Sequence, residues 1–467
     1  MEQLGTQETP LRAAIIGSGP SGFYAAESLL KDKNRMVQVD MFDRLPTPHG
    51  LVRGGVAPDH PKIKSVSKVY DKTAENPNFR FYGYVEYGKD ITLEDLKAHY
   101  HAVIFATGAQ SDRRLGVPGE DLPGSYPATE FVAWYNGHPD FRDLHFDLSQ
   151  ESVAVIGNGN VAMDVARILA SSYEELRVTD IADYALEALR ESKVKDIYML
   201  GRRGPAQAAF TNPELKEFGE LADADIVVKP EEAAADPLSL AALQAKPDAV
   251  ADKNLRTLAQ FAERPLSGKT KRIHMLFLVS PVELLGKDHV EAIKLVKNEL
   301  QAAPDGSLRA RATDQVETLP VGLVFRSIGY MGVPLPGLPF DQKAAVIPND
   351  HGRVIDPESK QPILGEYVVG WIKRGPTGVI GTNKPDSVET VNMLLEDMPK
   401  FAPLNPVNAT QESVEQLIKL RKPNYVSYPD WRLLDELERQ NGEAQGRPRV
   451  KFSRIEDMLS ALDQLKV

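Results

Sequence analysis

The glycine-rich stretch GSGPSG at residues 17–22 has the spacing of a dinucleotide-binding turn. In such a turn the first glycine permits a sharp bend, the second lets a pyrophosphate approach the backbone, and the third lets the following helix pack closely. Free N–H groups at the helix start would then face the phosphates. The residues expected to form this first cradle are Gly17, Gly19, Pro20 and Gly22.

Asp43 is expected to close the first cradle. It ends the next apolar segment, about twenty residues beyond Gly22, where this type of fold places an acid. A carboxylate there accepts hydrogen bonds from a ribose diol and repels a 2′-phosphate. The first cradle is therefore predicted to hold FAD or NAD rather than NADP. The alternative is an ordinary surface acid in the turn before LPTPHG.

A second stretch, GNGNVA at residues 157–162, repeats the pattern with alanine in the third place. At the position equivalent to Asp43 the second unit carries Arg202 and Arg203. Guanidinium groups suit a 2′-phosphate, and each charge-assisted hydrogen bond contributes roughly 1.5 to 3 kcal/mol. The second cradle is therefore predicted to hold NADP(H), which places a flavin opposite a nicotinamide. A solvated arginine pair is the alternative.

Each cradle needs a strand before it and a helix and a second strand after it. Apolar runs predict the first unit as a strand over residues 11–16, a helix over 21–31 and a strand over 36–44. The second unit is predicted as a strand over residues 152–156, a helix over 160–170 and a strand over 195–201. Two such units predict an α/β fold with two Rossmann-like dinucleotide-binding domains.

Gly/Pro-rich crossovers follow HAVIFATG and LPVGLVFRSIGY and mark the expected domain boundaries. They divide the chain into residues 1–109, 110–326 and 327–467. An Ala-rich stretch at about residues 230–264 is expected to be a solvated helical insertion without chemistry. The last ~65 residues are expected to form helices that pack on the first domain.

Composition excludes several classes of protein. The 467 residues include no cysteine, so this chain forms no disulfide, thiolate nucleophile or cysteine-ligated cluster. A net charge of −11 argues against general binding to nucleic acid or anionic membranes. No apolar run is long enough to span a bilayer, and the N-terminal MEQLGTQETP has no secretory or transit character. The expected location is the cytoplasm, and no metal site is expected.

Four longer blocks carry a resemblance to a known family: PTPHGLVRGGVAPDHPKIKSV, GNGNVAMDVARIL, GRRGPAQAAFTNPELKE and GWIKRGPTGVIGTN. With them, almost the whole chain resembles the adrenodoxin-reductase family of NADPH-dependent ferredoxin reductases, especially its actinobacterial members. The resemblance implies FAD in the first cradle, NADPH in the second, hydride transfer to the flavin, and single-electron delivery to a ferredoxin. It also implies that the NADP domain is inserted into a discontinuous FAD domain.

The resemblance further implies individual binding residues. For FAD these are Asp43, Leu51, Val85, Trp371, Gly378, Val379 and Ile380. For NADPH they are Arg113, Asn158, Gly159, Asn160, Val161, Arg202, Arg203, Glu214 and Gly378. Many relatives carry glutamate where this chain has Asp43. Because aspartate is shorter, the resemblance does not fix the geometry of its hydrogen bonds to the ribose.

Three residues are candidates for a part in the hydride transfer. Glu214 is predicted to accept hydrogen bonds from the nicotinamide carboxamide, although PELKEFGEL is also consistent with a surface helix. A contact between His60 and Asp164 would couple nicotinamide docking to the flavin environment. Hydride transfer itself needs no protein acid or base, so a purely structural histidine remains the alternative.

Without cysteine the chain holds no internal electron acceptor, so an external ferredoxin is the expected partner. Such partners are usually acidic, and a local basic patch is expected to dock it, although KIKSVSK is also consistent with a solvated face. A monomer is the working expectation for the oligomeric state. Alternatives are a flavin-bearing subunit of a larger NADPH-oxidising complex and a non-enzymatic NADP-binding protein. The candidate docking cations are Arg53, Lys62, Lys64, Lys68, Lys373 and Arg374.

Overall fold

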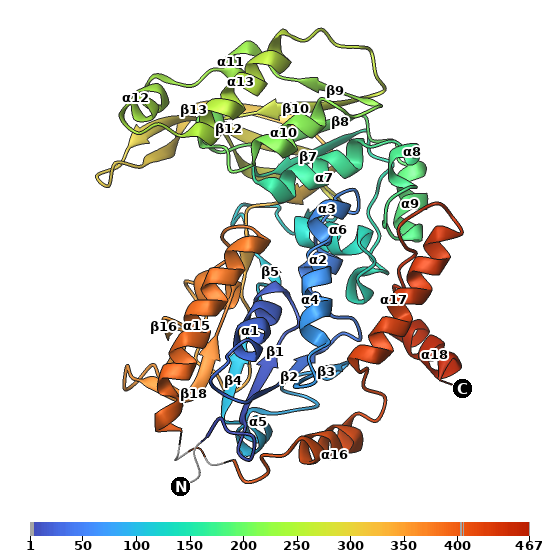
Figure 1. Ribbon diagram of the computed structural model, residues 1–467. Coiled ribbons are helices and arrows are strands. Elements are labelled where there is room, and N and C mark those ends of the chain that lie inside the picture. Colours follow the sequence, from blue (N-terminus) through green and yellow to red (C-terminus); the bar gives the residue numbers. More distant parts are fainter. Residues whose placement is uncertain (1–3, 402–403, 405, 467) are drawn as a thin grey trace.

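The computed structural model describes residues 4–401, 404 and 406–466, and Figure 1 shows its two halves, one above the other. Residues 1–3 of the N-terminal stretch, and residues 402–403, 405 and 467 of the C-terminal region, lie outside this part. Each half is built around one large β-sheet covered by helices.

The lower half contains a seven-stranded sheet in the order β16-β17-β18-β4-β1-β2-β3. Its inner strand β1 is entirely buried and pairs in parallel with β2 and β4. The strands are β1 (Leu11–Ile16), β2 (Val37–Asp43), β3 (Phe79–Gly83), β4 (Ala102–Phe105), β16 (Asn349–Asp350), β17 (Arg353–Ile355) and β18 (Pro362–Val368). The helices are α1 (Pro20–Leu30), α2 (Leu51–Gly54), α3 (Pro61–Lys64), α4 (Ser67–Ala74), α5 (Leu93–His99), α14 (Trp371–Arg374), η3 (Ile380–Thr382), α15 (Asn383–Asp397) and η4 (Met398–Lys400).

The upper half contains a six-stranded parallel sheet in the order β6-β14-β7-β8-β10-β9. Its strands are β6 (Ser125–Pro127), β7 (Ser152–Ile156), β8 (Asp196–Leu200), β9 (Ala224–Val227), β10 (Lys271–Leu276) and β14 (Leu323–Arg326). Its helices are α6 (Ala128–Tyr135), η1 (Pro139–Phe141), α7 (Asn160–Ala170), α8 (Tyr173–Leu176), α9 (Asp183–Arg190), η2 (Pro205–Gln207), α10 (Asn212–Phe218), α11 (Pro230–Ala233), α12 (Pro237–Ala245) and α13 (Ala249–Glu263).

The chain makes the lower sheet from two separate segments and the upper sheet from the segment between them, which confirms the predicted fold class. The two crossovers run side by side as the short antiparallel pair β5 (Ser111–Asp112) and β15 (Tyr330–Met331). A three-stranded antiparallel sheet, β11 (Val279–Leu285), β12 (Ala292–Ala302) and β13 (Leu308–Pro320), extends from the upper half.

The helical stretch at residues 230–264 is less solvated than expected. Helix α13 buries Leu258 and Phe261 against the upper core. Asn254 is also buried, and its Nδ2 donates to the carbonyl of Phe210 at 3.1 Å. The expectation of a solvated insertion was therefore wrong for α13, because one face of this helix supports the segment that leads into α10.

The C-terminal region forms helices α16 (Gln411–Arg421), α17 (Tyr428–Glu443) and α18 (Ile455–Leu465). Trp431 and Leu434 of α17 pack into the core of the lower half, as expected. The following loop also contacts the upper half, because the buried Arg447 donates from Nε to the carbonyl of Thr179 at 3.0 Å and from Nη1 to Asp183 at 2.5 Å. This region therefore ties both halves together.

Within the described part of the chain, no helix combines the length and the apolar character that crossing a membrane requires.

Candidate functional site: two dinucleotide cradles

The first glycine turn has the steric properties that a phosphate cradle needs. Gly17 has a φ of +109°, and a Cβ there would lie 2.5 Å from the carbonyl oxygen of Ala106. A Cβ on Gly22 would lie 2.2 Å from the carbonyl oxygen of Gly17. A Cβ on Gly19, in contrast, would meet no atom within 4 Å. Helix α1 begins at Pro20 without a side-chain cap, so its first N–H groups border open space that would fit a pyrophosphate.

Asp43 lies at the end of β2, as predicted, and its carboxylate contacts the chain itself. One oxygen, Oδ2, accepts from the backbone N–H and the hydroxyl of Ser18, at 2.9 Å and 2.5 Å. The other oxygen, Oδ1, accepts from the N–H of Leu45 at 2.9 Å. The acid thus holds the turn in shape and keeps a negative charge beside it.

Leu51 and Val85 border the same cradle. Leu51 is the first residue of α2 and follows Gly50, where a Cβ would lie 2.8 Å from the Cα of Gly19. The N–H of Val85 donates to the carbonyl of Asp43 at 2.9 Å. The structure therefore brings these two residues, far apart in sequence, to the first glycine turn.

The segment after β18 reaches the same turn from the other side. A Cβ on Gly370 would lie 2.5 Å from the hydroxyl of Ser21, which places this glycine directly on the first turn of α1. Trp371 begins α14, and its Nε1 donates to the carbonyl of Thr377 at 3.2 Å. Gly378 follows with a φ of +79°, so the chain turns sharply there.

A helix start follows this turn. Val379 is 58% exposed, and Ile380 opens the helical run that continues as α15. Helix α15 packs on α1, because the hydroxyl of Ser387 donates to the carbonyl of Ser21 at 2.9 Å. The structure thus gathers Trp371 and residues 378–380 near the first cradle, with main-chain N–H groups suited to the negative charge of a reduced flavin.

The second glycine turn repeats the geometry of the first. Gly157 has a φ of +138°, and a Cβ there would lie 2.1 Å from the carbonyl oxygen of Ser327. A Cβ on Gly159 would meet no atom within 4 Å. Helix α7 begins at Asn160 without a side-chain cap. The Nδ2 of Asn158 is buried and has no hydrogen-bond partner, so it is a donor that a bound dinucleotide would satisfy.

Two other predicted residues lie at the borders of the upper half. Val161, in the first turn of α7, packs partly buried against the upper core. Arg113 is exposed on the crossover, where its N–H donates to the carbonyl of Gly329 at 2.9 Å. Among the described residues, no hydrogen bond or ion pair joins the Arg113 side chain to another predicted site residue.

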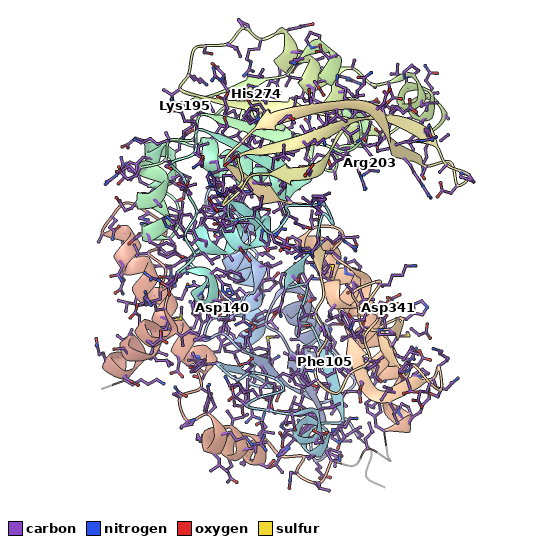
Figure 2. The ribbon with its side chains drawn as sticks, turned by 180° about the vertical axis from the view of Figure 1, so that it is seen from behind. Phe105, Asp140, Lys195, Arg203, His274 and Asp341 are labelled. Atoms are coloured by element: carbon purple, nitrogen blue, oxygen red, sulfur yellow. The ribbon has the colours of Figure 1, made fainter. Side chains whose placement is uncertain are left out.

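Arg202 and Arg203 are exposed at the end of β8, and no ion pair within the described residues engages either guanidinium. Their backbone is held, because Asn298 of β12 donates to the carbonyl of Arg202 at 2.9 Å and Leu278 donates to that of Arg203 at 3.2 Å. Figure 2 shows Arg203 beneath the three-stranded sheet. Two uncompensated cations are thus presented from a fixed backbone.

Glu214 lies in the first turn of α10, and its Oε2 is buried without a hydrogen-bond partner. The start of α10 is fixed on the second cradle, because the Oδ1 of Asn160 accepts from the N–H of Thr211 at 2.8 Å. Asn212 Nδ2 also donates to Asn254 of α13 at 3.2 Å. An unsatisfied carboxylate oxygen on a fixed helix is suited to accept a hydrogen bond from a ligand.

His60 lies where the two halves meet, but its hydrogen bond goes to a residue that the sequence did not single out. Its Nε2 lies 3.0 Å from Oε2 of Glu217, whereas its Nδ1 lies 3.9 Å from Oδ1 of Asp164, beyond hydrogen-bond distance. Arg167 of α7 binds Asp164 at 2.8 Å and Asp59, next to His60, at 2.6 Å. We call these five residues the domain contact.

One regularity of the sequence could have pointed to Glu217. In PELKE it lies three residues after Glu214, on the same face of a helix, as Arg167 follows Asp164 on α7. The sequence does not show that these two helix faces meet the loop around His60, because this contact depends on how the two halves pack together.

The domain contact predicts a pH-dependent stability. Burial lowers the pKa of His60, but the hydrogen bond to Glu217 and the charges of Asp164 and Asp59 outweigh this and raise the pKa above its usual value. Protonated His60 therefore stabilises the fold below its ordinary pKa of about 6.5, and this contribution is lost as the pH rises through the raised pKa. Because the Glu217 side chain is 37% exposed, we expect no more than about 1 kcal/mol.

Thermal unfolding of the wild type and Glu217→Gln at a series of pH values measures this effect. The melting temperature should differ most in mildly acidic buffer, and the difference should shrink as His60 loses its proton. A difference that stays constant with pH would assign the contribution to Arg167, 3.3 Å from Glu217, instead.

The candidate docking cations do not form one exposed patch. Lys373 is only 7% exposed and binds Glu389 at 2.7 Å. Arg53 binds Glu438, Lys64 binds Asp180, and Arg374 donates to Asn383 at 2.9 Å. The expectation of a shared docking surface was wrong for these four, because tertiary contacts already engage them. Lys62 and Lys68 are exposed.

The family model described as pyridine nucleotide-disulphide oxidoreductase matches residues 11–200, which include both glycine turns. Among curated proteins, the chain is 48% identical to "NADPH-ferredoxin reductase FprA" of Mycobacterium leprae, covering 96% of this chain and 97% of that one. It is 40% identical to "NADPH:adrenodoxin oxidoreductase, mitochondrial" of Arabidopsis thaliana, covering 97% of this chain and 95% of that one.

A solved structure, Mycobacterium tuberculosis FprA in complex with NADPH, is similar over 97% of this chain and 99% of its own. The TM-score is 0.90 and the sequence identity is 46%. The likeness thus extends over both sheets and the C-terminal helices rather than over one nucleotide-binding unit.

Proposed function

Since this chain belongs to the adrenodoxin-reductase family of NADPH-ferredoxin reductases, we propose that it is a flavoenzyme that carries electrons from NADPH through FAD to a ferredoxin. The observation that supports this most directly is the contrast between the two cradles: an acid closes the first, and two unpaired arginines close the second. Because the chain has no cysteine, the iron-sulfur acceptor must lie outside this chain.

The residues at each cradle fit the proposed cofactors. The bound flavin would supply the redox chemistry, because it takes up a hydride and releases single electrons. Gly17, Gly19 and the start of α1 would hold its pyrophosphate, and Trp371 with residues 378–380 would border its ring. These residues bind and orient, and none of them needs to exchange a proton.

For the coenzyme, Gly159 and Asn158 would hold the pyrophosphate, and Arg202 and Arg203 the 2′-phosphate. Glu214 would accept a hydrogen bond from the nicotinamide carboxamide. Asp164 and His60 would act as positioning residues that set how the halves meet. An unchanged rate of flavin reduction by NADPH in His60→Gln, measured by stopped flow, would remove His60 from this assignment.

The activity has a direct test. The purified protein should be yellow, should reduce ferricyanide with NADPH much faster than with NADH, and should reduce cytochrome c appreciably only when a ferredoxin is added. Colourless protein, or a preference for NADH, would contradict the proposal.

We propose that the electron partner is an acidic ferredoxin and that it docks at the exposed Lys62. The variant Lys62→Glu should lower the rate of ferredoxin reduction several-fold relative to ferricyanide reduction and weaken its dependence on salt. The ratio of the two rates across ionic strengths measures this, and an unchanged ratio would move the docking site elsewhere.

We also propose that the domains span residues 1–109, 110–326 and 327–467, and that the protein works as a monomer, since residues of a single chain form both cradles. We place it in the cytoplasm, where NADPH is available.

A further inference from the structure

A cavity of about 500 Å³ lies on α2–α4 and α17, and no residue of either glycine turn lines it. We call it the junction cavity, because three parts of the chain form its wall. These are helices α2–α4 of the lower half, Asp180 of the upper half, and the C-terminal region with α17 and residues 448–451. Its wall contains seven lysine and arginine side chains but only three carboxylates.

The deepest part of the wall has two lysines and one acid. Asp180 accepts from the Nζ of Lys64 at 2.6 Å and lies 3.4 Å from the Nζ of Lys451. The Lys451 side chain is 1% exposed. Burial acts to raise the pKa of Asp180, but the charges of Lys451 and Lys64 lower it to about 2. Lys451 also donates from Nζ to the backbone carbonyl and the side-chain oxygen of Asn136, each at 3.2 Å. Burial lowers the pKa of both lysines, and Asp180 is the one acid that pairs with them within the described residues.

Another part of the wall holds three arginines around one acid of α17. Asp435 of α17 is shared by Arg449 at 2.7 Å, Arg439 at 3.1 Å and Arg432 at 3.7 Å. Each arginine also lies near a second acid: Arg432 is 3.1 Å from Asp71, Arg439 is 3.2 Å from Glu436 and Arg449 is 3.1 Å from Glu438. A guanidinium has five N–H donors, and both acid contacts of Arg449 go through Nη1, so its Nε and Nη2 donors are not engaged by an acid within the described residues. Arg449 is one of the side chains that line the cavity.

Lys68 completes the cationic wall at its rim. It is exposed, and within the described residues no ion pair engages it. His49 adds no charge at neutral pH, since burial lowers its pKa to about 3. Glu438, behind the wall, binds Arg53 at 2.5 Å and Arg449 at 3.1 Å. Glu436 lies 3.2 Å from Arg439. With both of these acids counted, the lysine and arginine side chains still outnumber the carboxylates, seven to five.

We propose that the junction cavity binds a small multivalent oxyanion, a group with several phosphate or carboxylate charges. Charge-assisted hydrogen bonds from a partly enclosed set of cations favour such a ligand. Lys64 and Lys451 line the cavity but are largely buried, so a small anion suits these two cations better than a folded protein surface does. The site is distinct from the second cradle, because neither Arg202 nor Arg203 lines it.

Occupancy would also tie the halves together. The ligand would contact Lys68 of the lower half, the lysine pair that binds Asp180 of the upper half, and Arg449 of the C-terminal region. A ligand that binds only the folded arrangement raises the stability of that arrangement. We therefore expect the melting temperature of the protein to rise with the concentration of the anion.

Calorimetric titration of the FAD-loaded protein with inorganic pyrophosphate and, separately, with citrate tests the proposal. Saturating NADP⁺ is present in both, so that the second cradle is filled. Binding of either anion at one site supports the assignment. The anion that binds more tightly shows whether the site prefers phosphate or carboxylate groups. No binding of either anion would overturn it.

The variant Lys68→Glu should weaken binding at least tenfold, since it replaces a rim cation with a repelling charge. The matched control is Lys72→Glu, which makes the same change on the same helix at an exposed residue that does not line the cavity. Equal affinities of wild type and Lys68→Glu, or equal losses in both variants, would overturn the proposal. Displacement of the anion by ferredoxin would overturn it too, because the cavity would then belong to the docking surface.

Discussion

Replacing Gly19 with valine is expected to give a folded protein that retains no FAD and has no NADPH-dependent activity. The backbone at Gly19 is extended, with φ of −78° and ψ of −175°, so valine adopts it without strain. A Cβ there meets no protein atom within 4 Å. The added side chain would instead occupy the space assigned to the pyrophosphate, so the variant is expected to lose FAD binding rather than stability. Flavin absorbance and circular dichroism of the purified protein measure the two properties separately.

The matched variant Gly159→Val should show the opposite pattern. Its backbone is also extended and its Cβ position is equally open. We expect a yellow protein whose flavin is reduced by dithionite but not by NADPH. If Gly19→Val stays yellow, or if Gly159→Val loses its colour, the assignment of the two cradles is wrong.

Gly17→Val shows why the choice of glycine matters. With a φ of +109° and a carbonyl oxygen 2.5 Å from its Cβ position, this residue cannot be replaced without moving the backbone. We expect that variant to lose stability as well as FAD, so it does not separate folding from binding.

Local pattern predicted the elements that carry the cradles, because each is specified within its own segment. The strands at residues 11–16 and 152–156 and the helix at 160–170 have the predicted bounds. Helix α1 begins one residue earlier than expected, at Pro20, a favoured first position in a helix.

The errors concern contacts between distant segments. Lys64 and Lys373 resemble surface lysines in sequence, yet Lys64 pairs with Asp180, 116 residues away, and the buried Lys373 pairs with Glu389. The hydrogen bond from His60 to Glu217 joins residues 157 positions apart, which no local pattern encodes. Residue type shows that a side chain carries charge, whereas tertiary packing decides whether that charge is already paired.

The double variant Arg202→Ala/Arg203→Ala is expected to raise the KM for NADPH by at least about a hundredfold while leaving the KM for NADH nearly unchanged. Two charge-assisted hydrogen bonds of about 1.5 kcal/mol each supply roughly 3 kcal/mol, and 1.4 kcal/mol is a factor of ten. Neither arginine takes part in an ion pair within the described residues, so their removal leaves no buried acid without a partner. Steady-state ferricyanide reduction with each coenzyme measures the effect.

Arg311→Ala is a suitable control, because it removes an exposed arginine of β13 in the same half of the molecule. It should leave the ratio of the two KM values unchanged. NADH has the same pyrophosphate and nicotinamide as NADPH, so a variant that damages the cradle as a whole would raise both KM values together. A selective loss for NADPH therefore points to the 2′-phosphate alone. If the double variant still prefers NADPH, the coenzyme is recognised by cations other than this pair.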